Sequence, residues 1–517
     1  MTPILLTTLN SSYQHAAFGL RYLRANLGEL RDQSRILEFT TDRTARDVAE
    51  VLLSQNPKII GLGVYIWNTK QTLELVSLLK KLAPDVVLVL GGPEVSFETE
   101  KQELFQWADY VVCGEADFLF RELCTKILAG DKPSEKILRG ALPEIGAIQL
   151  PYSEYSDEDI KNRIIYVEAS RGCPYKCEYC LSSLDKSVRN FSLHQFLSEM
   201  QILLDRGVRQ FKFIDRTFNL SPSTSTQILQ FFLKNIQLGL FLHFEMVPDR
   251  LPDELKELIV QFPAGSLQFE IGVQTLNPQV AALVSRRNDY QKMKDNLRFL
   301  REKTSVHTHV DLIAGLPGED IGSFAKGFDE LVLLEPDEIQ VGILKRLRGT
   351  PIVRHDQNWQ MLYQEQSPYQ VISTKMISFA ELQQINRFSK HWDQIANSGQ
   401  FIETTKYLRN HAVSSQQSFF QLFAELSQFL TQKFPTSQNV GVVNLFHGVF
   451  QFLLQAKLLP ENEVKTLLAK DYARSGRHDL PTFLKMRTSV DLGNSRKAQA
   501  SSSVPKRQRL HLSHENP

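Results

Sequence analysis

Length, composition and charge place the chain among ordinary globular proteins and exclude several classes. Its 517 residues are 42% hydrophobic, and 59 basic against 58 acidic side chains leave a net charge of +1. This balance argues against a nucleic-acid partner and against an anionic membrane surface. The N-terminus lacks the basic segment and cleavage site of a signal peptide, and no apolar run reaches the ~18 residues of a membrane helix. We therefore expect a cytoplasmic protein whose five cysteines stay reduced.

Residues 1–150 alternate short apolar strands with helical stretches. Five such pairs follow one another, from PILLTTLN with GLRYLRANL to DYVVCGE with DFLFRELCTKIL. Continuous apolar strands alternating with helices predict a doubly wound parallel sheet with helices on both faces. Such a sheet binds its ligand beyond the carboxyl ends of its strands. Small or polar residues at those ends are the candidate contacts, although any single glycine could equally serve a turn: Asn10, Ser11, Tyr13, Gly63, Tyr65, Asn68, Gly91, Gly92, Glu94, Gly114 and Glu115.

Residues 160–360 contain six further strands, and each but the last precedes a helical stretch. Six units suit a partial (β/α)6 barrel better than a complete eightfold one. Because side chains alternate along a strand, the polar residues of three strands share the inward face. We expect that face to bind a polar ligand, with its histidines more readily explained as ordinary core residues: His243, Glu245, Gln268, Glu270, Gly272, Gln274, His307, His309 and Asp311.

The remainder of the chain changes character twice. Residues 361–487 show helical periodicity, and the aromatic stripe of SFFQLFAELSQFL predicts a helical domain with its own core. Residues 488–517 are rich in Ser, Lys and Arg and poor in large apolar residues, which predicts a disordered basic tail. Its KRQR run is more simply a solvated stretch than a binding site for an acidic partner.

Three of the five cysteines lie within eight residues of one another. Cys173, Cys177 and Cys180 have CxxxCxxC spacing directly after the first strand of the second segment. A structural zinc site takes four ligands, and no fourth Cys or His stands at a suitable distance. An odd cluster cannot pair fully into disulfides. Thiolates suit an iron–sulfur cluster, on which three protein ligands would leave one iron open.

These cysteines belong to the sequence CPYKCEYC, which resembles the signature of the radical S-adenosylmethionine (SAM) superfamily. Four more stretches that resemble its motifs follow in order: FIDRTFN, FEIGVQTLN, DLIAGLPGE and LRGTPI. The resemblance implies that the three cysteines hold a [4Fe-4S] cluster whose fourth iron binds SAM. Carried over by position, it places these residues near SAM: Tyr179, Asp215, Asn219, Glu245, Glu270, Gly272, Gln274, Asp311, Gly315 and Pro317.

The first segment is similar to the cobalamin-binding domain that precedes the barrel in a large subclass of this superfamily. The stretches NSSYQHAAFGLRYL, IIGLGVYIWN, VVLVLGGPEVS and DYVVCGEAD carry the likeness, and the candidate contacts at the strand ends are then cobalamin contacts. The DxHxxG motif of domains that place a histidine beneath cobalt is absent. Either cobalamin binds without such a ligand, which we favour, or the domain has lost it and covers the substrate.

The implied activity is reductive cleavage of SAM to a 5′-deoxyadenosyl radical, with cobalamin as methyl carrier in a C-methyltransferase. The substrate is an unknown small molecule, and an external low-potential donor such as flavodoxin or ferredoxin supplies the electron; no residue receives a catalytic role. Two alternatives stay open: a cobalamin-independent radical SAM rearrangement or oxidation, and a non-catalytic iron–sulfur sensor or binding protein. A methylthiotransferase needs three further cysteines in the first segment, where only Cys113 and Cys124 occur.

Overall fold

The structure is a computed structural model that describes residues 2–435, 439–475, 477, 479–484 and 504–512. The chain divides into two compact units, and the division falls inside the segment predicted to form the barrel. The first comprises Met1–Arg216, Lys345–Val353 and Gln364–Gln370, and the second comprises Thr217–Leu344, Arg354–Tyr363 and Val371–Pro517. No helix among the described residues is long and apolar enough to cross a membrane.

The first unit contains the parallel sheet predicted for the N-terminal segment. Its strand order is β2-β1-β3-β4-β5-β6, and every neighbouring pair is parallel. The sixth strand is short and was not predicted. The strands are β1 (Ile4–Asn10), β2 (Ser34–Thr40), β3 (Ile59–Gly63), β4 (Val87–Gly91), β5 (Tyr110–Cys113) and β6 (Ile137–Arg139).

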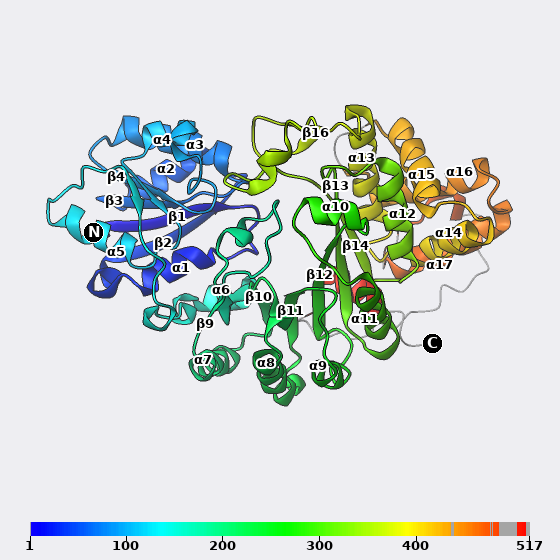
Figure 1. The fold of residues 1–517 in the computed structure, drawn as a ribbon, viewed down its shortest axis with the longest axis horizontal. Helices are drawn as coiled ribbons and strands as arrows, with labels where there is room; N and C mark the ends of the chain where they lie inside the picture. The colour runs from blue at the N-terminus through cyan, green and yellow to red at the C-terminus, as the bar shows by residue number, and fades with distance from the viewer. Residues whose placement is uncertain (1, 436–438, 476, 478, 485–503, 513–517) are drawn as a thin grey trace. The chain divides into compact units, whose positions relative to one another are not determined.

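Helices cover both faces of this sheet, as Figure 1 shows, so the doubly wound prediction is confirmed. Val48, Leu75 and Leu104 pack on one face, and Leu20 and Phe120 pack on the other. Strands with apolar residues on both faces need such double cover. The first face carries α2 (Ala45–Leu53), α3 (Thr69–Leu82) and α4 (Glu103–Trp107), and the second carries α1 (Phe18–Ala25) and α5 (Leu119–Leu128).

The first unit continues with the short helix α6 (Asp157–Asn162) and with the start of the second predicted segment. Here β7 (Ile165–Val167) pairs in parallel with β10 (Gln210–Phe213), and α7 (Leu193–Asp205) connects them. Between β7 and α7, β8 (Ser170–Arg171) and β9 (Arg189–Asn190) pair antiparallel. The three clustered cysteines lie in the loop that this short pair closes.

The second unit contains the other four predicted strands, in the order β14-β13-β12-β11 and all parallel. They are β11 (Phe241–Met246), β12 (Leu267–Gln274), β13 (His307–Ala314) and β14 (Glu338–Ile343). Their helices are α8 (Pro222–Lys234), α9 (Asp253–Ile259), α10 (Pro278–Leu283), α11 (Tyr290–Lys303) and α12 (Ile321–Val332). A small antiparallel pair follows, β15 (Leu362–Tyr363) with β16 (Val371–Ser373).

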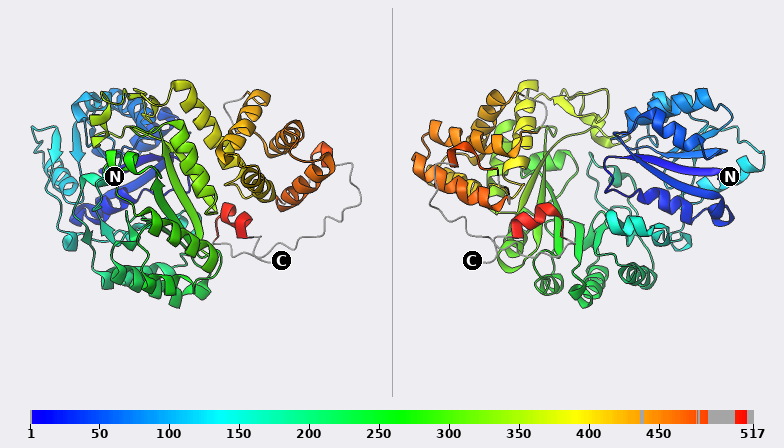
Figure 2. Two further views of the ribbon diagram at one scale, coloured as in Figure 1. Left: turned by 45° about the vertical axis from the view of Figure 1, so that its right-hand side comes forward. Right: turned by 180° about the vertical axis from the view of Figure 1, so that it is seen from behind.

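The C-terminal segment is helical, with five main helices among the described residues, and Figure 2 shows the yellow and orange helices of this segment gathered together. These are α13 (Phe379–Ile395), α14 (Ile402–Ser414), α15 (Phe419–Lys433), α16 (Val442–Gln455) and α17 (Glu461–Arg474). The predicted aromatic stripe packs in the core. The ring centroids of Phe388 and Phe420 lie 4.6 Å apart in a stacked pair, and those of Trp392 and Phe423 lie 5.0 Å apart.

The prediction of a disordered tail is wrong for one stretch. Residues 506–512, which include the KRQR run, form the helix α18 (Lys506–Leu512). Polar contacts hold this helix against two strands of the second unit. Gln508 Nε2 donates to Gln268 Oε1 at 2.9 Å, and Arg507 lies 2.9 Å from Glu338. Most of the predicted tail, residues 488–503 and 513–517, lies outside the described residues.

Candidate active site

The cysteine loop is a tight turn within the first unit. The Cys173 N–H donates to Asp185 O at 3.0 Å, and the Cys180 N–H donates to Cys177 O at 3.1 Å. Gly172 precedes the first cysteine with φ +91, and a Cβ there would lie 2.0 Å from the carbonyl oxygen of Ser187. Only glycine fits that position.

The loop presents three cysteine side chains, of which those of Cys173 and Cys177 are buried and that of Cys180 is half-buried. Three thiolates on one buried loop are the donor set that an iron–sulfur cluster requires. The other two cysteines do not fit this role. Cys113 packs in the core on one face of the N-terminal sheet and Cys124 in the core on the other, and burial raises the pKa of Cys124 to about 12. A methylthiotransferase's second cluster therefore has no ligand set among the described residues of this domain.

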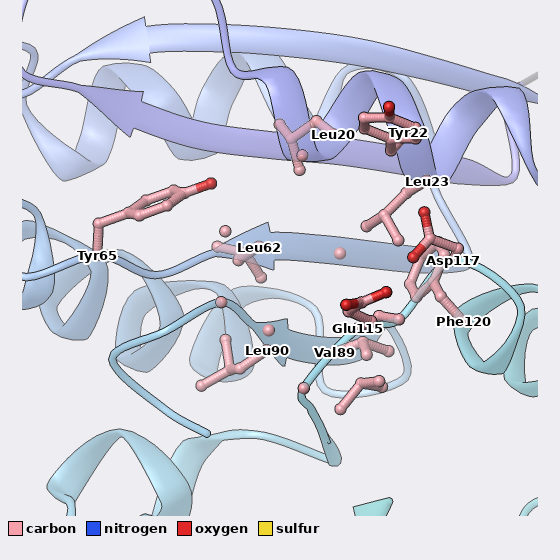
Figure 3. A pocket seen from close by; sticks show the side chains of 18 of the residues that line it. Leu20, Tyr22, Leu23, Leu62, Tyr65, Val89, Leu90, Glu115, Asp117 and Phe120 are labelled. Atoms are coloured by element: carbon pink, nitrogen blue, oxygen red, sulfur yellow. The ribbon is translucent and has the colours of Figure 1, made fainter. Parts of the chain in front are cut away.

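A cavity of about 230 Å³ opens at the carboxyl ends of β3, β4 and β5 in the same unit. Figure 3 shows Tyr65 at one end and the carboxylates of Glu115 and Asp117 at the other, with Leu62, Val89 and Leu90 along its floor. Strand ends of a doubly wound sheet are where such domains bind ligands. Six predicted contacts line the cavity: Gly63, Tyr65, Gly91, Gly92, Gly114 and Glu115.

Glycines keep this cavity open. Gly92 has φ +107, and a Cβ there would lie 2.5 Å from Val64 O, so its backbone requires glycine. At Gly63 and Gly91 the nearest atoms to an added Cβ lie at 3.4 and 3.6 Å, which is ordinary contact. The backbone tolerates a Cβ at these two positions, and a larger side chain there would occupy part of the cavity that they line. The cavity is mostly apolar and is bordered by glycines, so a ligand can approach the strand ends closely, and the described lining residues include no histidine.

Five predicted contacts do not line the cavity. Ser11 and Tyr13 are exposed. The side-chain amide of Asn10 donates to His15 O and Glu38 Oε1, and that of Asn68 donates to Thr8, Leu9 and Gly63. These two amides brace the strand ends.

The fifth of these residues, Glu94, is 4% exposed and belongs to a long-range cluster of the first unit. Its Oε1 lies 2.9 Å from Arg348 Nε and accepts from the Tyr369 hydroxyl at 2.5 Å. Burial and the carboxylate together raise the pKa of Tyr369 to about 12. Both partners come from the two later segments that complete this unit.

Arg171 connects the cavity to the cysteine loop. It lines the cavity, lies in β8 and stands two residues before Cys173. Its guanidinium lies 2.9 Å from each of the carboxylates of Glu115, Asp117 and Glu168. The sequence did not indicate this residue, because its partners are assembled from separate elements.

The predicted polar face of the second unit is present. Strand register aligns Glu245, Glu270, His309 and Glu338 across β11 to β14. His243 Nε2 lies 2.9 Å from Glu270, and His309 Nε2 lies 3.2 Å from Asp311. Although burial opposes a charged ring, these carboxylates raise the pKa of His309, with Asp311 contributing most and then Glu338 and Glu270.

The other predicted SAM contacts are distributed as follows. Gln274 has φ +72, and its side-chain amide folds over Gly272, where a Cβ would lie 2.6 Å from it. Gly315 begins the turn to Pro317 with φ +87. Tyr179 is half-buried in the cysteine loop.

Two predicted contacts use their side chains to hold backbone. Asn219 accepts from Val247 N at 3.1 Å and donates to Val247 O and Arg250 O. Asp215 accepts from Ala169 N and from the Ser170 hydroxyl, and burial raises its pKa to about 6. Both fix the ends of strands.

Comparisons with known families agree with this arrangement. Residues 4–124 match the B12 binding domain, and residues 167–331 match the radical SAM superfamily. Residues 357–514 match a family described as a protein of unknown function, DUF4080. The chain is a radical SAM enzyme that combines a radical SAM domain with an N-terminal B12-binding domain. The cofactors that these domains define are a [4Fe-4S] cluster, SAM and cobalamin.

Individual relatives are distant. The chain is 24% identical over 332 residues to the uncharacterized methyltransferase PH0819 of Pyrococcus horikoshii, covering 58% of this chain and 70% of that protein. It is 23% identical over 310 residues to the cobalamin-dependent radical SAM methyltransferase TokK of Streptomyces tokunonensis, covering 53% of this chain but only 45% of that protein. The fold resembles that of the cobalamin-dependent SAM radical enzyme OxsB, with a TM-score of 0.58, 14% identity and coverage of 92% and 84%.

Proposed function

We propose that this protein is a cobalamin-dependent radical SAM methyltransferase that acts on a small molecule. The observation that carries the proposal is that one compact unit holds both the glycine-bordered cavity and the loop of three clustered cysteines, with Arg171 connecting them. Two of the relatives described above bear methyltransferase names, which supports the same reaction class.

The proposed cofactor residues follow from position and environment. Cys173, Cys177 and Cys180 would hold the cluster, and Gly63, Gly91 and Gly114 would border cobalamin. The polar face of β11 to β13 would receive the amino, carboxylate and ribose groups of SAM. When bound, the three groups supply reductive cleavage of SAM and methyl transfer, with electrons from an external donor such as flavodoxin or ferredoxin.

The chain's own residues hold and shield these groups. Arg171 fixes the base of the cysteine loop through three carboxylates, so the loop keeps one geometry. The buried strand ends exclude water from the cavity floor, where Leu62 and Leu90 are at most 2% exposed. Such burial and the hydrogen bonds of the loop also tune a cluster's potential.

The cluster assignment has a direct test in Cys177→Ala. Anaerobically reconstituted wild-type protein should hold about four irons per chain and release 5′-deoxyadenosine from SAM with dithionite. The variant should lose at least three quarters of the iron and all cleavage, because a required thiolate is gone. The matched control is Cys113→Ala, which removes a buried thiol from the sheet and should keep both. Cleavage that survives in Cys177→Ala would contradict the assignment.

The cobalamin assignment is tested separately by Gly91→Leu. Protein from cells given hydroxocobalamin should carry about one corrin per chain, measured from its visible spectrum, and the leucine should reduce this about fivefold by filling the cavity. Iron content should not change. Gly146→Leu is the control, because nothing lies within 4 Å of an added Cβ there and the residue is remote from the cavity lining. Equal corrin in the two variants would place cobalamin elsewhere.

A further inference from the structure

The second unit contains a cluster of potential metal ligands that the proposed function does not use. Its members come from the first residue of β13, the residue before β14 and helix α18. His307, Asp337 and His511 each offer a ligand atom, and these atoms lie within 4.8 Å of one another. His511 belongs to α18, so the cluster connects that helix to the strands of the second unit.

Hydrogen bonds fix the tautomers of both imidazoles. His307 Nε2 lies 2.9 Å from Glu338 Oε1, while the other Glu338 oxygen lies 2.9 Å from Arg507. Glu338 Oε1 is a carboxylate acceptor, so this hydrogen bond places a proton on His307 Nε2. His511 Nε2 lies 3.0 Å from the carbonyl oxygen of Asn397, which can only accept. In both rings the hydrogen bond occupies Nε2, so Nδ1 is the nitrogen that would coordinate a metal.

The carboxylate of Asp337 is oriented in the same way. Its Oδ2 accepts from the backbone N–H of Thr308 at 2.8 Å and from the Thr308 hydroxyl at 3.0 Å. The other oxygen, Oδ1, has Arg301 at 4.0 Å, beyond hydrogen-bond distance. Each of the three side chains is thus oriented by hydrogen bonds through one atom, and its other donor atom is the one that would bind a ligand.

The cluster also has an entry path, because the three residues line a groove of about 800 Å³. Metal-ligating histidines typically donate their other ring N–H to a carboxylate or a backbone carbonyl, and both arrangements occur here.

We propose that His307, Asp337 and His511 form a binding site for a divalent metal of the zinc class, which fastens α18 to the second unit. Two imidazole nitrogens and one carboxylate oxygen are the donors that such an ion prefers. Zinc bonds of about 2.0–2.2 Å require the donors to approach one another by about 1 Å. The fourth position faces the groove and takes water.

The test uses full-length protein with its cluster reconstituted, so that the three cysteines are occupied. After EDTA treatment, addition of Zn²⁺ and desalting, elemental analysis should find about one zinc per chain. His511→Ala and Asp337→Asn should each retain less than about a fifth of that zinc. His447→Ala, which removes a half-buried histidine of α16, should bind as wild type.

Trypsin cleavage within α18 provides a second measurement. Zn²⁺ should slow cleavage after Arg507 and Arg509 about tenfold in wild type, EDTA should reverse this, and His511→Ala should show no effect of zinc. Iron content and circular dichroism equal to wild type will show that the variants fold. The proposal would be overturned if wild-type protein retained no zinc after desalting and zinc did not slow its cleavage by trypsin. Full zinc retention in His511→Ala would also overturn it.

Discussion

At the scale of single residues, Glu319 has the most unusual environment of the DLIAGLPGE stretch. Its side chain is 2% exposed, Oε1 accepts from the Thr275 hydroxyl at 2.7 Å, and Oε2 has no hydrogen-bond partner among the described residues. Burial raises the pKa of Glu319 to about 7. The native state therefore binds a proton more tightly than the unfolded chain does, so this residue makes stability fall as pH rises from its ordinary pKa near 4.5 toward 7.

Glu319→Gln should remove that dependence. The amide keeps the acceptor for Thr275 and carries no charge, so the variant should match wild type near pH 5 and exceed it above pH 8 by up to about 3 kcal/mol. Urea unfolding at the two pH values measures the difference. Glu302→Gln, at an exposed position on α11, should change neither value. An equal effect of Glu319→Gln at both pH values would show that packing rather than charge decides the result.

At the scale of elements, the β8–β9 pair connects the cavity to the cysteine loop through ion pairs. Its strands contribute Arg171 and Arg189, and both contact Glu115 at the cavity end. Although burial opposes its charge, Glu168 and Asp117 raise the pKa of Arg171, so the guanidinium stays charged. Two strands of two residues cannot be stable alone. Their geometry depends on these ion pairs.

Arg171→Leu should therefore be costly. It leaves Glu115, Asp117 and Glu168 without their shared cation, and loss of one partner from a buried ion pair costs about 3–5 kcal/mol. The free energy of unfolding in urea, with iron content per chain, measures this. Arg298→Leu breaks the exposed pair with Asp295 and should cost under about 1 kcal/mol. A loss below 1 kcal/mol in Arg171→Leu would mean that the hairpin is held by packing alone.

At the scale of the whole molecule, the elements were predictable and the long-range partnerships were not. Unbroken apolar runs predict the buried strands, and period-two alternation correctly placed Glu270 and His309 on one face. Arg171 had no sequence signal, because its partners Glu115 and Asp117 precede it by more than fifty residues. Helix α18 was missed because its contacts are polar, as between Gln508 and Gln268, and hydropathy does not report such contacts.

The strand-end rule predicted the cavity but not how each polar side chain is used. Gly63 and Gly91 line it, as expected from their positions. Asn68 and Glu94 also follow strand ends, yet the Asn68 amide donates to backbone carbonyls and the Glu94 carboxylate accepts from Arg348 and Tyr369. Sequence identifies where a ligand can approach, whereas the satisfaction of each buried donor and acceptor depends on the completed fold.

The contact between Glu94 and its distant partners bears on how this protein is made. Arg348 and Tyr369 follow Glu94 by 254 and 275 residues. During synthesis the N-terminal sheet emerges first, and the Glu94 carboxylate lacks one or both partners until Arg348 and then Tyr369 have left the ribosome. The unit that holds the cofactor cavity therefore becomes complete only when two segments that are translated after most of the barrel have joined it.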